Sequence, residues 1–227
     1  MANNYWDMTG TLTCSKVTPV LRALFDQFSL ESDDRGAVIG VEAESSAADF
    51  PEWQDSLDNL LAQLGLPLPD DLLEGSDRLT AQLDRLAEHF GTAASPAYTA
   101  LRDSLVDDLL QESHVSLDAM FNLALLLDDG HGLSAMATEG AWTCSKHRLF
   151  EFGGSGTYAS VLVRSASTST TARENGALLD AALKADNLDE AARLLGEQVS
   201  QALEQVQDLP VRAALRGMVA AQLLHSK

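Results

Sequence analysis

The densest group of side chains that could carry chemistry follows residue 130 and consists of His131, Cys144, His147 and Glu151. A cysteine beside a histidine can act as a nucleophile with its general base. Cys144 and His147, however, stand three positions apart on a segment expected to pass from strand to loop, where their side chains need not meet. No family motif that fixes an oxyanion donor flanks the cysteine. An enzyme that uses the Cys144/His147 region is therefore kept as an alternative.

The same residues, together with Cys14, offer ligand types that zinc prefers. Structural zinc sites usually draw on pairs such as C-x-x-C or H-x-x-x-H, because two near neighbours fix half of the tetrahedron. The chain contains neither spacing. Its acidic doublets, such as Asp128-Asp129, lie outside any EF-hand-type calcium loop. We therefore expect no metal or other cofactor, and we assign no catalytic residue from the sequence.

A glycine-rich run occupies residues 153–156 (GGSG) and lacks the phosphate-binding pattern G-x-x-x-x-G-K-[ST]. Glycine reaches positive φ without strain, so the run is typical of a tight turn. We predict that it joins two later strands, over 133–144 and 157–164. Glu151 and Phe152 are expected to shape the same turn.

The strongest signal in the chain is the distribution of its charge. The 227 residues include 34 Asp/Glu and 15 Lys/Arg, a net charge of −19. Residues 26–129 contain 23 of the acidic and 4 of the basic residues, which accounts for the whole net charge. Such a field repels nucleic acid and anionic membranes and attracts basic partners. The competing interpretation is that the excess of Asp/Glu only keeps the protein in solution.

Several carboxylates of this acidic half share one face of a predicted element. Glu42 and Glu44 alternate on the wetter face of a strand expected over 37–44. Like charges held this close weaken a fold slightly, which favours a role outside the fold. The candidate partner-binding residues are Glu42 and Glu44 and, on predicted helices, the i,i+4 pairs Asp84/Glu88 and Asp103/Asp107 together with Asp108.

Hydrophobic periodicity predicts an α+β fold. Thr-rich or alternating segments over 5–15 and 37–44, with the two later segments named above, predict about four strands in one small, mostly antiparallel sheet. Residues 31–36 are expected to form a loop. Apolar residues at helical spacing after Ser, Thr, Asp or Pro predict that most of the remainder is helical. The helices are expected near 19–28, 51–64, 76–90, 96–112, 116–127, 172–185, 188–207 and 211–225.

Composition and length bound the organisation of the chain. A hydrophobic content of 45% can supply a sizeable core. We predict an acidic α+β domain over 1–165 and a helical region over 166–227, whose Ala-rich faces suit packing or pairing with a second copy as a homodimer. The sequence lacks a membrane-spanning apolar stretch and a signal-peptide pattern, and its two cysteines suit a reducing compartment, so the expected location is the cytoplasm.

Four segments carry a resemblance: residues 17–20 (VTPV), 128–133 (DDGHGL), 139–146 (EGAWTCSK) and 148–154 (RLFEFGG). With them the chain resembles uncharacterised proteins of integrative conjugative elements and plasmids of Gram-negative bacteria, from its start to about Tyr158. The resemblance carries no known reaction and so assigns no role to any residue. It implies a setting on mobile DNA, where small acidic proteins often disarm host defences.

These observations support three functional hypotheses. The leading one is a non-enzymatic interaction protein whose carboxylates occupy the basic groove of a nucleic-acid-binding protein or complex. It would act as a nucleic-acid mimic that inhibits a host defence system such as CRISPR or restriction, and would bind neither nucleic acid nor membrane directly. The alternatives are the enzyme at Cys144/His147 and an accessory scaffold protein of the mobile element.

Overall fold

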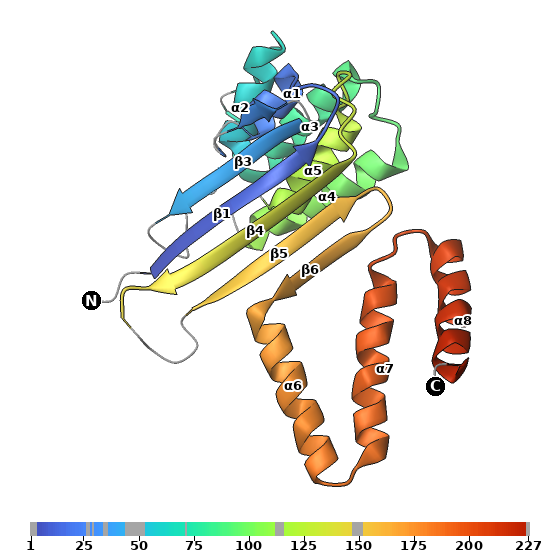
Figure 1. The fold of residues 1–227 in the computed structure, drawn as a ribbon. Helices are drawn as coiled ribbons and strands as arrows, with labels where there is room; N and C mark the ends of the chain where they lie inside the picture. Colours follow the sequence, from blue (N-terminus) through green and yellow to red (C-terminus); the bar gives the residue numbers. More distant parts are fainter. Residues whose placement is uncertain are drawn as a thin grey trace.

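The fold, seen in a computed structural model, combines one antiparallel sheet with a larger number of helices (Figure 1). The structure describes residues 4–25, 28, 30–33, 36–43, 53–70, 72–111, 116–146 and 152–225. The strands are β1 (Asn4–Thr13), β2 (Glu31–Asp33), β3 (Gly36–Ala43), β4 (Ala135–Cys144), β5 (Gly153–Ser160) and β6 (Arg164–Thr168). The helices are α1 (Pro19–Phe25), α2 (Trp53–Gln63), α3 (Gly75–His89), α4 (Pro96–Gln111), α5 (Leu117–Leu126), α6 (Ser169–Lys184), α7 (Leu188–Glu204) and α8 (Leu209–His225).

The sheet has the strand order β2-β3-β1-β4-β5-β6, and every neighbouring pair is antiparallel. The α+β class and the single antiparallel sheet are thus confirmed, and all four expected strands lie in it. Two short strands extend its edges. β2 falls in the segment expected to be a loop, where Glu31 pairs with Val38, and β6 runs through a Ser/Thr-rich segment that pairs with β5. Short polar edge strands of this kind carry little hydrophobic pattern and are hard to recognise in a sequence.

Side-chain caps explain where several helices begin. The Ser116 hydroxyl accepts a hydrogen bond from Ala119 N at 3.1 Å, and Asn187 Oδ1 accepts one from Glu190 N at 3.1 Å. Thr168 Oγ1 accepts from Thr171 N at 3.3 Å. Helix α6 therefore begins at Ser169, earlier than the sequence pattern indicates, because Thr168 already satisfies one of its free N–H groups. None of the described helices is long and apolar enough to cross a bilayer.

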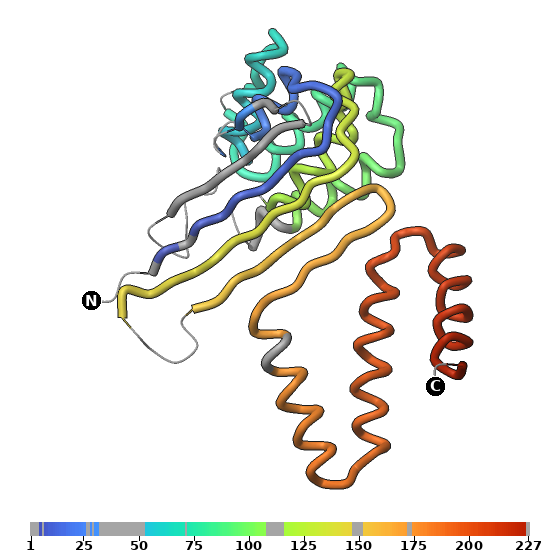
Figure 2. The backbone as a smooth tube through the Cα atoms, viewed as in Figure 1, coloured from blue at the N-terminus to red at the C-terminus, as the bar shows by residue number. Residues whose placement is uncertain are grey.

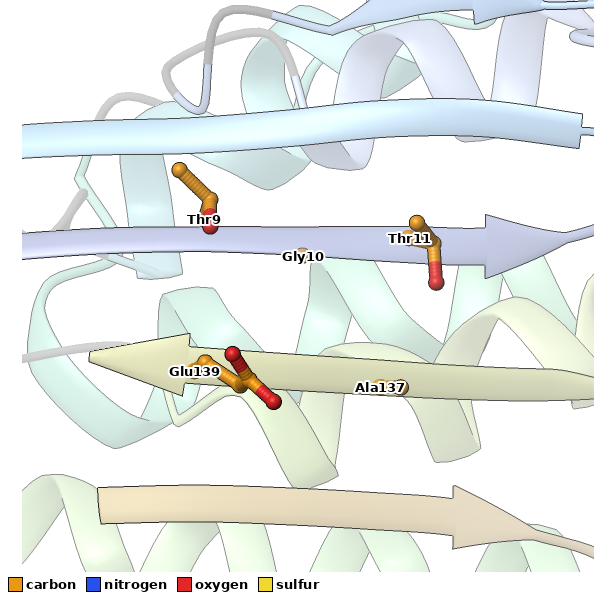
Figure 3. Close-up of a pocket in the computed structure, with 5 residues that line it drawn as sticks. All are labelled: Thr9, Gly10, Thr11, Ala137 and Glu139. Carbon is orange, nitrogen blue, oxygen red and sulfur yellow. The ribbon is translucent and has the colours of Figure 1, made fainter.

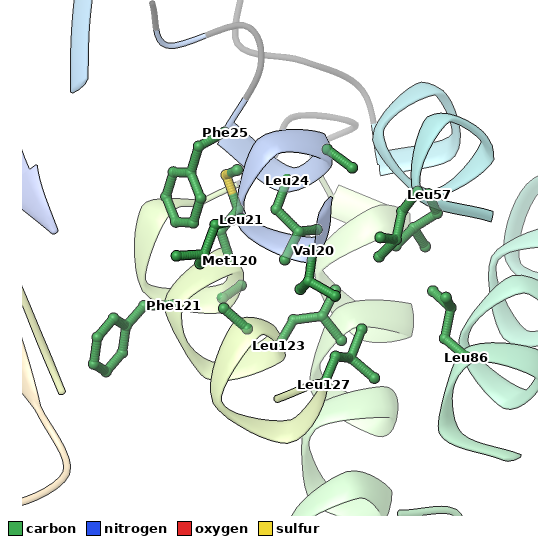
Figure 4. Packing of buried hydrophobic residues seen from close by; sticks show 14 of the residues in the cluster. Val20, Leu21, Leu24, Phe25, Leu57, Leu86, Met120, Phe121, Leu123 and Leu127 are labelled. Atoms are coloured by element: carbon green, nitrogen blue, oxygen red, sulfur yellow. The ribbon is translucent and has the colours of Figure 1, made fainter. Parts of the chain in front are cut away.

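The core lies between one face of the sheet and helices α1–α5 (Figure 4). Helix α1 is central to it: Val20, Leu21, Leu24 and Phe25 are fully buried. They meet an equally buried face of α5 and side chains from the sheet and from α2 and α3. These residues include Met120, Phe121, Leu123 and Leu127 around α5, Leu57 and Leu86 on α2 and α3, and Met8, Leu12 and Met136 on the sheet. Figure 1 shows that this helical layer covers only one end of the long strands.

The C-terminal helices lie beside the sheet, away from α1–α5 (Figure 2). Backbone hydrogen bonds tie the α7–α8 connection to the β5–β6 turn: Arg164 N donates to Gln205 O and Gln207 N donates to Leu162 O, at 2.8 and 2.9 Å. The division at residue 165/166 stays a prediction, and it falls inside β6.

The turn predicted at residues 153–156 is wrong. These residues form the first half of β5, where Gly153 pairs with Trp142 and Gly156 with Glu139, and none of them has a positive φ. Position 153 requires glycine because there is no room for a side chain. A Cβ there would lie 2.5 Å from Cε2 of Trp142 and 2.8 Å from Ser169 Oγ. Phe152 precedes the strand and is exposed, while Glu151 lies outside the described residues.

Replacing Gly153 by alanine should lower the free energy of unfolding by about 1–3 kcal/mol, because the added methyl group overpacks against the Trp142 ring. The matched control is Gly156→Ala in the same strand, whose Cβ would meet nothing nearer than Thr138 O at 3.7 Å. Urea unfolding of the three proteins measures the difference. Equal stability of Gly153→Ala and wild type would contradict the packing explanation.

Candidate functional site

The structure places five of the predicted partner-binding residues on two adjacent helices and describes the side chains of four of them. Asp84 and Glu88 lie on α3, and Asp103 and Asp107 lie on α4, which packs against α3. Glu88, Asp103 and Asp107 are exposed, whereas Asp84 is half-buried.

The other three predicted residues are described less fully. Glu42 is placed by its backbone in β3, opposite Asp7 of β1. Asp108 is likewise placed by its backbone in α4. Glu44 lies outside the described residues. Among the candidate residues whose side chains are described, the exposed ones lie on helices α3 and α4.

Asp84 differs from its neighbours because it holds the two helices together. Its Oδ1 accepts a hydrogen bond from the hydroxyl of Tyr98, which is only 3% exposed, and lies 3.7 Å from an Arg102 nitrogen. Burial raises the pKa of the Tyr98 hydroxyl, and the hydrogen bond to the Asp84 carboxylate raises it further. Tyr98 therefore stays protonated and donates, and Asp84 serves the α3–α4 contact.

The basic residues of the acidic half are all engaged within the fold, as far as the structure describes them. Arg78 pairs with Asp58 at 2.7 Å. Arg85 donates to the Pro67 carbonyl. Arg102 donates to Asp103 at 3.0 Å and lies over the Tyr98 ring, 5.8 Å from its centroid. Of the described guanidinium groups of this half, only that of Arg102 pairs with an outward carboxylate of the candidate surface, Asp103.

More carboxylates face solvent here than the candidate list contains. Asp55 on α2, Glu74 and Asp77 at the start of α3, and Asp118 on α5 are also exposed. Their positions between the apolar positions of each helix are the sequence signal that could have found them. Together with Glu88, Asp103 and Asp107 they make the outer surface of α2–α5 an anionic layer, which we call the acidic helical layer.

The opposite face of the sheet carries a shallow hollow of about 300 Å³ lined by Thr9, Gly10, Thr11, Ala137 and Glu139 (Figure 3). Thr9 pairs with Glu139 and Thr11 with Ala137 across β1 and β4. Figure 3 shows the Glu139 carboxylate and the threonine side chains rising from these two strands. Its described lining offers threonine hydroxyls and one carboxylate, and this carboxylate adds to the anionic exterior.

The structure separates the residues of the proposed Cys/His cluster. Cys144 pairs with Asn4 at one end of β4, and Ala135, four residues after His131, pairs with Thr13 at the other end. A strand of 10 residues spans about 30 Å. Cys14 directly follows Thr13, so it lies at the His131 end. Cys144 therefore cannot share an ion with His131 or Cys14, and His147 lies outside the described residues.

His131 has a structural role that the sequence did not reveal. Its ring is 1% exposed. Nδ1 accepts a hydrogen bond from Leu133 N at 2.9 Å, and Nε2 lies 3.0 Å from Ala124 O. A carbonyl can only accept, so Nε2 carries the proton and the ring is neutral. Both nitrogens are thus used to join the end of α5 to the start of β4.

Asp128, Asp129 and His131 form a cluster with metal-ligand geometry, their ligand atoms lying within 4.8 Å of one another. The fold uses these groups itself. Asp128 Oδ1 accepts from Gly130 N at 2.9 Å, and Asp129 Oδ2 accepts from Val20 N at 3.2 Å, at the start of α1. Burial acts to raise the pKa of Asp128. Hydrogen bonds from backbone N–H groups, that of Gly130 first, outweigh burial, so the pKa of Asp128 is lowered.

A backbone bond from Ser15 N to His131 O at 2.7 Å completes the same turn. The DDGHG segment is therefore a clamp that fixes β1, α1 and β4 to one another.

The His131→Ala variant should lose about 2–4 kcal/mol of unfolding free energy, because it opens a cavity and leaves Leu133 N and Ala124 O without their partner. The exposed His89, whose ring lies edge-on to that of Phe90, supplies the control His89→Ala. Thermal or urea unfolding followed by circular dichroism compares the two. A His131→Ala protein as stable as His89→Ala would show that the clamp contributes nothing.

Comparison of the chain with protein-family models, with curated proteins and with solved structures gives no match. A functional assignment must therefore come from the geometry and charge of the chain itself.

Proposed function

We propose that this chain is a non-enzymatic interaction protein whose acidic helical layer binds a basic, nucleic-acid-binding surface of another protein or complex. One observation carries the proposal: Arg78 and Arg85 bond within the fold and Arg102 pairs with Asp103, while the other carboxylates of the layer face outward.

The spacing of the carboxylates supports mimicry of a nucleic-acid backbone. Residues four apart on a helix, such as Asp103 and Asp107, rise about 6 Å along its axis. Phosphates of one DNA strand follow one another every ~3.4 Å along the axis, so a carboxylate pair of this kind spans about two phosphate intervals of a Lys/Arg groove. Binding would replace nucleic acid in the groove, with no direct contact between this chain and nucleic acid.

The setting we propose is inhibition of a host defence system, such as CRISPR or restriction, in the bacterial cytoplasm. The resemblance to uncharacterised proteins of mobile elements, from the start of the chain to about Tyr158, supports this setting, because such elements encounter these nucleases on entry. Long-range attraction suits an inhibitor that must compete with DNA or RNA, since opposite charges raise association rates strongly.

Reversing exposed charge on α3 and α4 tests the proposal directly. The variant Glu88→Lys/Asp107→Lys should lose at least about tenfold in capture of its partner from a bacterial lysate, because two attractive contacts become repulsive. The control is Glu174→Lys/Asp180→Lys on α6, which changes the net charge equally at a distant surface. Capture is quantified by mass spectrometry, and circular dichroism verifies that each variant is folded.

Retained capture by the α3/α4 variant would refute the proposed surface. An equal loss in both variants would mean that net charge, and no particular surface, drives binding.

A further inference from the structure

The hollow on the open face of the sheet presents polar groups that the fold does not use. Glu139, Thr9 and Thr11 are exposed, and they lie on the face opposite the buried Met8 and Met136. Within the described part of the chain, no ion pair or hydrogen bond engages the Glu139 carboxylate. In Figure 3 this carboxylate and the Thr11 hydroxyl both lie between β1 and β4. The hollow therefore combines a free carboxylate with hydrogen-bonding oxygens.

The strand register explains why the surface beside Glu139 is open. Glu139 lies opposite Thr9 of β1 and opposite Gly156 of β5, and Ala137 shares its face two residues earlier. A glycine and an alanine leave the space next to the carboxylate unfilled. Tyr158 lies opposite Ala137 and is 45% exposed. It is thus a diagonal neighbour of Glu139, at about 7–8 Å, a separation that an aromatic side chain can bridge.

The face around the hollow carries negative charge only, as far as the structure describes it. Strand alternation assigns to this face the odd-numbered positions of β1 and β4 and the even-numbered positions of β5. These positions hold Thr, Ser, Ala, Gly and Tyr, the carboxylates Asp7 and Glu139, and no Lys or Arg. Asp7 is exposed and is a second diagonal neighbour of Glu139. A cation in the hollow would therefore be attracted by both carboxylates.

We propose that the hollow is a subsite for a guanidinium group, supplied by an arginine side chain of a partner protein. The planar fork of N–H donors can bind both oxygens of the Glu139 carboxylate and still donate to the Thr9 or Thr11 hydroxyl. Its flat face can stack on the Tyr158 ring. A divalent metal ion fits less well, because Ca²⁺ takes about six to eight oxygen ligands and the described lining supplies one carboxylate.

The shape of the hollow favours a protein side chain over a free small molecule. Small-molecule sites enclose roughly 300–1,000 Å³ and bury most of their ligand. This hollow is shallow and has about 300 Å³. An arginine side chain needs no enclosure by this chain, because the rest of the partner covers it. The hollow faces away from the acidic helical layer, so the inference does not rest on the proposed function.

Titration of the full chain with an arginine analogue tests the proposal. The probe is N-acetyl-arginine amide at about 150 mM salt, where long-range attraction is screened. NMR follows the backbone amide signals of Thr9, Thr11 and Ala137. They should shift saturably with a dissociation constant on the order of 10 mM, because a single solvent-accessible ion pair binds weakly. The neutral isostere, N-acetyl-citrulline amide, should bind at least about fivefold more weakly.

Substitutions locate the binding site. Glu139→Gln should weaken binding of the arginine analogue at least about fivefold, because a neutral amide replaces the carboxylate. The matched control, Asp189→Asn, removes one charge at the start of α7, which Figure 1 shows far from β1 and β4, and should leave binding unchanged. Tyr158→Leu should weaken binding about twofold or more, and Tyr158→Phe should not, because the ring contacts the cation. Circular dichroism verifies that each variant is folded.

Four outcomes would each overturn the proposal. The first is equal binding by Glu139→Gln and Asp189→Asn, and the second is citrulline analogue that binds as tightly as arginine analogue. The third is a shift of the same signals by magnesium chloride at lower concentration, which would indicate a metal site. The fourth is a change of these signals with protein concentration alone, which would indicate that a second copy occupies the face.

Discussion

The pairing of β1 with both β3 and β4 is the constraint on which the rest of this structure depends. β1 occupies a middle position in the sheet and is paired along nearly its whole length on both sides. β4 follows β1 by more than a hundred residues. Its pairing with β1 therefore brings together the two ends of the long segment that contains α1–α5. The clamp made by Asp128, Asp129 and His131 fixes this closure at the point where the core begins.

Folding of this segment between β1 and β4 turns its excess of Asp and Glu into an anionic surface. The carboxylates of its helices α2–α5 belong to the helical layer that covers one end of the sheet (Figure 1). Few cations compensate the negative charge of the layer. Its described arginines bind Asp58, the Pro67 carbonyl and Asp103. The repulsion that remains is tolerated because the apolar side of the same helices is fully buried.

The sequence predicts the helices and the four main strands well because these elements carry periodic apolar positions and recognisable caps, such as Ser116. It fails where the reason for a residue lies on another element. Gly153 was assigned to a turn, but the Trp142 ring on the neighbouring strand determines it. His131 was grouped with Cys144, yet strand length separates them and the ring bonds the backbone of α5 and β4. The helical pattern predicts Asp84 as a partner-binding residue, whereas its carboxylate accepts a hydrogen bond from Tyr98 on the neighbouring helix.

The central claim is that the acidic helical layer attracts a basic partner through its field. The most direct measurement is the association rate with the captured partner between about 50 and 500 mM salt, a range over which the Debye length shortens roughly threefold. The account predicts that the rate falls at least about tenfold across this range, while the dissociation rate changes much less. An association rate that is indifferent to salt would contradict it.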